Sequence, residues 1–183
     1  MPQEESAGPG AGDVTFQVLG ALAARDADGR SLDLKGPRHR AVLARLLVAR
    51  RRTVPVDWMV DDFWDEPPPR AVGAIRTFVG DLRKALEPGR ARRAPARLLV
   101  TSGPGYALLA GGGAVDAWRF EAAVAEAGRL LAPGAGDSAG AALGLLDDAL
   151  AAWRGPAYAE WAGQDWARAE AGRLDGLRLL AVE

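Results

Sequence analysis

The chain has 183 residues, of which 49% are hydrophobic and 26% charged, so it can bury a core in one domain or in two small ones. It contains no cysteine, which excludes disulfides, thiolate zinc sites and a cysteine nucleophile and favours a reducing compartment. No apolar run reaches the roughly 18 residues that a membrane span needs, and the N-terminus lacks the pattern of a secretion signal. We therefore expect a cytoplasmic protein with no membrane association.

Charge is distributed unevenly along the sequence. Residues 35–110 hold 15 Lys and Arg against 7 Asp and Glu, a net charge of +8. The remaining residues hold 8 against 17, a net charge of −9, and the two parts together give the overall −1. A basic segment between acidic flanks predicts a module that binds a polyanion, joined to something else. Arginines clustered on solvated helix faces are the alternative.

The N-terminal part predicts a tail and a few short strands. Residues 1–13 are rich in Gly, Pro and acidic residues without an apolar period, which predicts a disordered tail. The apolar residues Val14, Phe16 and Val18 then alternate with polar ones, and "DADG" at 26–29 is a turn signal. This pattern predicts short antiparallel strands.

Two helices are predicted next. Residues 36–52 begin with Pro37, a favoured first helical residue, and have one apolar and one very basic side. Asp57 is predicted to cap a short second helix that buries Met59, Val60 and Phe63 and ends before the triple proline at 67–69.

A third helix, "GAIRTFVGDLRKAL", is predicted over residues 73–86. At about 100° per residue, its apolar residues share one side, and small, polar or cationic residues occupy the opposite side. The first set is Ile75, Val79, Leu82 and Leu86, and the second is Gly73, Arg76, Thr77, Gly80 and Lys84. Two short apolar runs, 98–100 and 106–109, then flank "TSGPG", which predicts a hairpin.

The glycine run at 110–113 predicts a domain boundary. Three helices are expected beyond it, with short loops, as in an antiparallel helical array. Asp116 is expected to cap the first. The apolar sides of the three are predicted to carry, in order, Phe120, Val124 and Leu131; Leu143, Leu146, Leu150 and Trp153; and Trp166, Leu174 and Leu177.

The order of the first elements is that of a winged helix. In such a domain the third helix enters the DNA major groove and the hairpin reaches the adjacent backbone. The groove admits a helix whose outer side is not bulky, guanidinium groups can reach base edges, and a threonine can contact a thymine methyl. We therefore expect DNA contacts from the third helix, the start of the first helix and the hairpin turn, with Arg38, Arg40, Arg76, Thr77, Gly80, Arg83, Lys84, Ser102 and Gly105 as the candidate residues.

Several segments in sequence order carry a family resemblance. They are "LKGPRHRAVLARLLV", "VPVDWMVDDFWDEPPPRAVGAIRTFVGDLRKAL", "LLVTSGPGYAL", "VDAWRFEAAVAEA" and "LAAWRGPAYAEW". Together they resemble the Streptomyces antibiotic regulatory protein family, and the resemblance runs from about Val14 to Glu183. It implies a mainly α fold with small β-sheets: a winged helix-turn-helix followed by a tetratricopeptide-like helical domain of the bacterial transcriptional activator type.

The resemblance also implies domain limits and a function. The expected parts are the winged helix at 14–110, a linker at 111–114 and an incomplete activator-type domain at 115–183. The implied protein is a sequence-specific transcriptional activator that binds double-stranded DNA at direct repeats, contacts RNA polymerase and serves secondary metabolism. A homodimer on DNA is a further expectation.

The third helix and the hairpin depart from the family pattern. Val72, Gly73, Gly80 and Asp81 stand where the family usually has Arg, Asn, Ser and Arg, and Ser102 stands at a usual arginine of the hairpin. Each lost phosphate contact weakens DNA binding and its salt dependence. The alternative function is therefore a protein-interaction module that keeps this fold and has weakened or lost DNA binding.

No residue pattern favours an enzyme, a metal or a cofactor. His39 is the only histidine, so a catalytic triad or metal set has no second member, and a solvated or phosphate-side position on the first helix is expected. The acidic residues Asp61, Asp62, Asp65 and Glu66 lack the ligand spacing of a calcium loop and predict a solvated helix end or a protein-contact patch.

Overall fold

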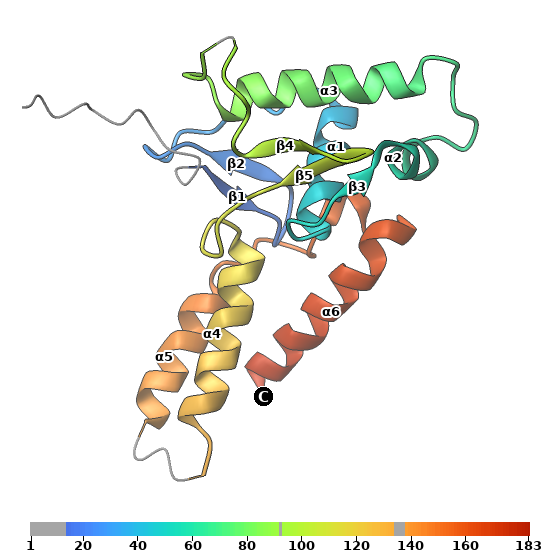
Figure 1. The fold of residues 1–183 in the computed structure, drawn as a ribbon. Helices are drawn as coiled ribbons and strands as arrows, with labels where there is room; N and C mark the ends of the chain where they lie inside the picture. The colour runs from blue at the N-terminus through green and yellow to red at the C-terminus, as the bar shows by residue number, and fades with distance from the viewer. Residues whose placement is uncertain (1–13, 92, 134–137) are drawn as a thin grey trace, which may run out of the picture. The chain divides into compact units, whose positions relative to one another are not determined.

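The structure, a computed structural model, describes residues 14–91, 93–133 and 138–183 (Figure 1). The chain divides into two compact units. Ala24–Gly111 lie in the first unit, and Phe16–Ala23 together with Gly112–Glu183 form the second. Two short strands, β1 (Thr15–Gln17) and β2 (Ala23–Arg25), pair in a two-stranded sheet at the two ends of the segment 16–23.

The first unit contains three helices and a three-stranded sheet. The helices are α1 (Pro37–Val48), α2 (Val56–Phe63) and α3 (Ala71–Leu86). The strands β3 (Val54–Pro55), β4 (Leu99–Ser102) and β5 (Gly105–Leu108) pair in the order β3-β5-β4. This is the predicted winged-helix order, with β3 as an additional strand.

Helix α1 begins at Pro37, as predicted, but ends at Val48. The prediction carried the helix to residue 52. Arg50 and Arg51 have φ angles of 50° and 67°. These left-handed conformations cannot continue a right-handed helix, so the chain turns here toward β3.

The start of α2 differs from its prediction. Pro55, rather than Asp57, occupies the N-cap position, and no side chain caps the helix. Asp57 lies in the first turn, where its charge still favours the positive end of the helix dipole. Met59, Val60 and Phe63 are buried, as predicted.

The core of the first unit lies where α3 packs against α1 and α2. Ile75, Val79, Leu82 and Leu86 are all buried, which confirms the predicted apolar side of α3. With this side fixed against the core, the opposite side of α3 has to face outward.

Two glycines shape the hairpin of β4 and β5. Gly103 has a φ of 51°, which suits the tight turn between the strands. Gly105 pairs with Ser102 of β4 and Pro55 of β3, and a Cβ atom added to it would lie 1.9 Å from the Val54 carbonyl oxygen. Only glycine allows β3 to approach β5 so closely.

The second unit is built from α4 (Asp116–Leu130), α5 (Ala139–Leu150), a 3-10 turn η1 (Ala159–Trp161) and α6 (Asp165–Val182). Helices α4 and α5 pack against each other, and α6 contacts both. Arg173 of α6 holds Glu170 by two hydrogen bonds of 2.9 Å and also pairs with Glu121 of α4. These hydrogen bonds, first that to Glu170, raise the pKa of Arg173.

The segment 16–23 joins the second unit through its backbone. Asp116 is 2% exposed, and its carboxylate accepts hydrogen bonds from the Val18 and Leu19 amides at 2.8 and 3.2 Å. The Val18 and Leu19 carbonyl oxygens accept from the Tyr158 and Arg154 amides. The sequence assigned residues 16–23 to the winged-helix domain, whereas these bonds place them with residues 112–183.

Asp116 therefore differs from its predicted role. Val115 holds the N-cap position of α4, with no side-chain cap, and Asp116 is the first helical residue. Its carboxylate also accepts from the Ala117 amide at 2.8 Å and lies 3.3 Å from the Arg154 guanidinium. A buried carboxylate with several donors is well satisfied, which explains how this position tolerates a charge.

The predicted burial of the apolar sides of the last three helices is confirmed only in part. Phe120 and Leu174 are buried, but Leu131 is exposed and Leu143 of α5 is 61% exposed. The residues buried in α5 are Ala142 and Ala149. In a helix made mostly of Ala, Gly and Leu nearly every side is apolar, so periodicity does not select the packed one.

Candidate nucleic-acid interface

The outward side of α3 is small and cationic. Gly73, Arg76, Thr77 and Lys84 are exposed, and Gly80 is half-buried. A Cβ atom added at Gly73 or Gly80 would meet nothing within 4 Å, so no packing contact requires either glycine. The result is a helix face with two bare positions and two long cationic side chains.

The two cations of this face differ in their partners. Arg76 has no side-chain partner among the described residues. Lys84 lies 3.3 Å from the Asp81 carboxylate, one turn back on the same helix. Arg76 is therefore the guanidinium that is available for an external acceptor.

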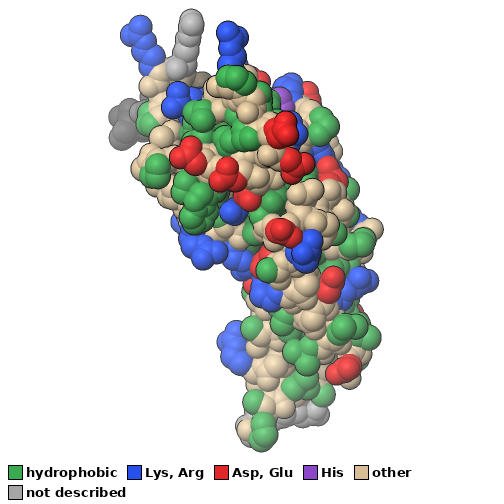
Figure 2. All heavy atoms as spheres, turned by 90° about the vertical axis from the view of Figure 1, so that its right-hand side faces the viewer, with side chains coloured by type: hydrophobic (Ala, Val, Ile, Leu, Met, Phe, Trp, Pro, Cys, Tyr) green, Lys and Arg blue, Asp and Glu red, His purple; other side chains and the backbone are tan. Residues whose placement is uncertain are grey.

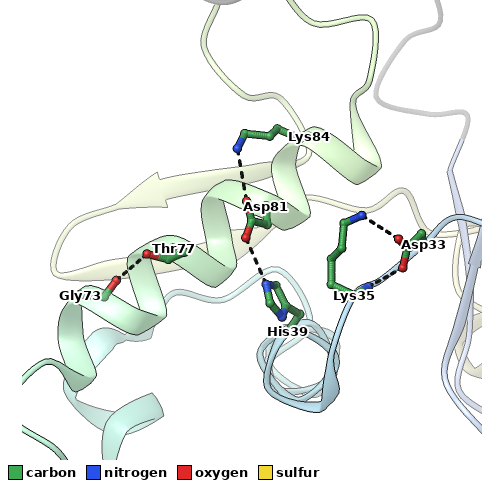
Figure 3. A network of polar contacts seen from close by, with 7 residues as sticks. All are labelled: Asp33, Lys35, His39, Gly73, Thr77, Asp81 and Lys84. Atoms are coloured by element: carbon green, nitrogen blue, oxygen red, sulfur yellow. Dashed lines mark hydrogen bonds and ion pairs between the residues drawn. The ribbon is translucent and has the colours of Figure 1, made fainter.

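Asp81 links the face to α1, as Figure 3 shows. Its second carboxylate oxygen lies 3.3 Å from the His39 Nε2 atom, and the His39 ring lies 4.7 Å from the Phe78 ring. The hydrogen bonds from His39 and then Lys84 lower the pKa of Asp81. His39 is half-buried between the helices, so the expectation of a solvated or phosphate-side histidine is not met.

A second ion pair lies beside this network. The Lys35 ammonium is 2.6 Å from the Asp33 carboxylate, just before α1 (Figure 3). Their hydrogen bond lowers the pKa of Asp33 and raises that of Lys35. The Asp81 charge makes a further, smaller contribution to the raised pKa of Lys35.

Thr77 turns its hydroxyl onto its own helix. The hydroxyl donates to the Gly73 carbonyl oxygen at 3.1 Å, one turn earlier (Figure 3). This is the local bond that threonine commonly makes inside helices. The hydroxyl proton is thereby used within the protein.

The half-buried Arg83 contacts the hairpin. Its guanidinium donates to the Leu99 carbonyl at 2.8 Å and the Thr101 hydroxyl at 2.9 Å, and it lies 5.6 Å from the Tyr106 ring centre. These contacts fix α3 to β4 and β5. Arg83 thus positions the candidate interface and does not extend from it.

The arginines at the start of α1 are also engaged. Arg38 donates to the Phe63 carbonyl and lies 4.8 Å above the Trp64 ring, at the end of α2. Arg40 is half-buried and interacts within the protein. Phosphate contacts by either residue would compete with these interactions.

The hairpin turn presents few groups of its own. The Ser102 hydroxyl lies 2.7 Å from the Thr53 hydroxyl, which joins the turn to the residue before β3. Gly105 is buried by β3, so its role in the fold is packing. Of the nine candidate residues, the structure brings four together on one outward face: Arg76, Thr77, Gly80 and Lys84.

A separate acidic surface covers α2. Asp57, Asp61, Asp65 and Glu66 are exposed, and the Trp58 side chain among them is 59% exposed. Figure 2 shows acidic side chains gathered over this part of the unit. Asp62 instead pairs with Arg45 of α1 at 2.6 Å. No group of three possible metal ligands occurs in the described ranges, and no helix there is long and apolar enough to cross a membrane.

The sequence did not reveal two features of α3. Val72 is 36% exposed at the start of α3, although its residue type suggests burial. The contact between His39 and Asp81 joins positions 42 residues apart, and no local pattern indicates such a pair. Only the packing of α1 on α3 creates it.

The comparisons with known proteins agree with this architecture. Residues 115–183 match the bacterial transcriptional activator domain family. The Transcriptional regulatory protein MoaR1 of Mycobacterium tuberculosis is 40% identical over 149 residues, which cover 80% of this chain and 46% of MoaR1. The Regulatory protein AfsR of Streptomyces coelicolor is 36% identical over 187 residues, which cover all of this chain and 17% of AfsR.

A solved structure has the same fold. Mycobacterium tuberculosis EmbR, in complex with a low-affinity phosphopeptide, superposes with a TM-score of 0.80 at 30% identity, over 92% of this chain and 43% of the EmbR chain. This chain spans less than half the length of each of these relatives. The likeness covers both units and confirms the predicted fold class of a winged helix followed by a helical domain. The chain belongs to the Streptomyces antibiotic regulatory protein family and carries a bacterial transcriptional activator domain at residues 115–183.

Proposed function

We propose that this protein is a transcriptional regulator that binds double-stranded DNA in a sequence-specific manner, with α3 in the major groove. The observation that carries the proposal is the outward face of α3, where Arg76 and Lys84 flank the bare positions Gly73 and Gly80. A helix enters the groove only if its outer surface is small, and cations on it meet base edges or phosphates. The names of the relatives, all regulatory proteins, support the same role.

The finer parts of the proposal concern promoter binding. The first unit would bind direct repeats in promoters, as a homodimer on DNA, and the activator domain would contact RNA polymerase in the cytoplasm. The family to which the chain belongs supports a role in secondary metabolism. Neither part of the proposal needs catalysis, a metal or a cofactor.

The test is a gel shift against the DNA upstream of the protein's own gene, repeated over a salt series. We expect binding whose logarithm falls linearly with the logarithm of salt, by about 0.9 per phosphate contact. The double variant Arg76→Ala with Lys84→Ala should bind at least about tenfold more weakly at low salt and show a flatter slope.

A matched control removes two exposed helix arginines from the second unit, Arg129→Ala with Arg168→Ala. It changes the net charge by the same amount and should leave the affinity and the slope within about twofold. Equal losses in both double variants would show that only overall charge matters, and no binding by the wild type at low salt would overturn the proposal.

One observation favours the alternative of a protein-interaction module. Asp81 places a carboxylate beside the cations of α3, and Arg38 and Arg83 are used inside the fold. The exposed Trp58 among acidic residues offers a surface for a basic protein partner. Recovery of a stable protein complex that Trp58→Ala abolishes, together with no DNA binding, would favour this alternative.

A further inference from the structure

We propose that Thr77 reads a thymine through the thymine C5-methyl group, with its own methyl as the contacting atom. The inference rests on the proposed DNA binding of α3 and names the base that this helix selects. It depends on where the Thr77 hydroxyl points and on what surrounds the side chain.

The Thr77 hydroxyl is engaged within its own helix. Its proton is donated to the Gly73 carbonyl at 3.1 Å, so it is not available to a base acceptor. The bond directs the oxygen to the backbone of the preceding turn, which leaves the methyl group as the part of the side chain that is not engaged within the helix. Thr77 therefore presents an apolar surface from a polar residue type.

The Thr77 side chain is accessible from outside the protein. Thr77 is exposed, and its neighbours Gly73, four residues before it, and Gly80, three residues after it, lack side chains. Asp81, four residues after it, has its carboxylate engaged with His39 and Lys84. Apart from the backbone of α3 and the glycines' chain neighbours, no atom of the described residues lies within 4 Å of where either Cβ would be. A base edge can therefore approach the Thr77 methyl without displacing another side chain.

A threonine methyl matches one chemical group of the DNA major groove. In the major groove only thymine presents a methyl group, and apolar groups such as a threonine methyl contact it favourably. Arg76, adjacent in sequence and without a partner in the described part of the chain, can donate two hydrogen bonds to a guanine. The face is thus suited to a thymine near a guanine.

The experiment uses the full chain and duplexes enriched by it from a randomised DNA library. Each thymine of the enriched sequence is replaced in turn by deoxyuridine, which pairs identically and lacks only the methyl group. We expect one position at which this change weakens wild-type binding about fivefold, the effect of about one buried methyl group.

Two variants of Thr77 separate its methyl from its hydroxyl. Thr77→Ser keeps the hydroxyl and should bind the thymine and uracil duplexes equally. Thr77→Val keeps a methyl and should retain the discrimination. Because Thr77 is exposed, both variants should fold, and the urea midpoint checks this.

Different outcomes would overturn DNA binding by α3 and thymine recognition by Thr77. Absence of any duplex binding at low salt overturns the proposed function, and this inference with it. DNA binding by the wild type with equal affinity for all thymine and uracil duplexes overturns the inference alone. Discrimination that Thr77→Ser keeps and Thr77→Val loses also overturns it, because the hydroxyl would then be the reading group.

Discussion

At Asp81 a carboxylate lies among the cations of the outward face of α3, 3.3 Å from Lys84 on the same helix and 3.3 Å from His39 on α1. Such a carboxylate repels DNA phosphates and holds Lys84 away from them. It also fixes α3 to α1 through His39. At this residue, therefore, the packing of the two helices and the binding of DNA make opposite demands.

Asp81→Asn should therefore strengthen DNA binding. The change removes one negative charge from the face and releases Lys84, and we expect a gain of roughly two- to tenfold at low salt that fades as salt rises. Fluorescence anisotropy with a labelled duplex measures it. The exposed Asp175→Asn on α6 provides the control with the same charge change and should leave affinity unaltered. Weaker binding by Asp81→Asn would show that the carboxylate contacts a base.

The same residue predicts a pH dependence of stability. The pKa of Asp81 is lowered from its usual 3.8, first by His39 and then by Lys84. A lowered pKa means that the ionised carboxylate stabilises the fold above pH 3.8 and that this contribution disappears as the pH falls below it. The free energy of unfolding of the wild type should thus exceed that of Asp81→Asn near neutrality, and the difference should vanish in acid. Urea unfolding from about pH 2.5 to 7 measures this difference, and a difference independent of pH would contradict the assignment.

Helix α3 combines a fixed apolar side with an outward side that contains two glycines, which are poor helix formers. Glycine inside a helix costs about 1 kcal/mol relative to alanine, and α3 contains it at positions 73 and 80 without a packing contact that requires it. Arg83 meanwhile anchors the helix to the hairpin at Leu99 and Thr101. Helix α3 is therefore fixed to the core and the hairpin on one side, while its outward side has two positions without side chains.

Gly80→Ala should raise stability and lower DNA affinity. The alanine should raise the free energy of unfolding by about 0.5–1 kcal/mol, because its Cβ meets no atom within 4 Å, while its methyl lies on the groove face. Gly128→Ala in α4, which is equally unobstructed, should give the same gain in stability with no change in DNA binding. Thermal unfolding and a gel shift test both, and equal DNA affinities for the two variants would argue against close approach at Gly80.

At the scale of the molecule, the activator-domain unit is completed by residues from the N-terminal part of the chain. Residues 16–23 bond to it through the Asp116 carboxylate, and the Phe16 amide donates to the Ala114 carbonyl at 2.7 Å. Residues 115–183, which match the activator domain family, thus lack one segment of the compact unit found here. The two units are joined by more than one crossing of the chain.

Asp116→Ala should destabilise this unit strongly. It leaves the buried Val18 and Leu19 amides without their acceptor, which costs about 1–3 kcal/mol for each unsatisfied group. We expect a loss of roughly 2–5 kcal/mol in urea unfolding and faster amide hydrogen exchange in residues 16–23 and α4. The exposed Asp147→Ala of α5 should change stability by less than about 0.5 kcal/mol. Unchanged exchange in residues 16–23 would contradict the role of Asp116.

The sequence alone predicted the order of the helices and the hairpin, and which side of α3 faces outward, but not the strand β3. Pro37, the triple proline, the glycines near the hairpin and the strict spacing of Ile75, Val79, Leu82 and Leu86 act locally, so one sequence suffices to predict them. In α5 the periodicity of apolar residues does not identify the packed side, because Ala and Leu occur on every side of the helix. The pattern was informative only where apolar and polar residues contrast.

Tertiary structure alone decided which charged groups remain available. Arg38, Arg76 and Arg83 are the same residue type, yet of these three only Arg76 lacks a side-chain partner among the described residues, because Trp64 and the hairpin lie beside the other two. The assignment of residues 16–23 to the second unit likewise depends on Asp116, about 100 residues away. Long-range packing decides both the availability of the arginines and the placement of residues 16–23, and local periodicity carries no information about such packing. The outward face of α3, in contrast, follows from the spacing of its apolar residues.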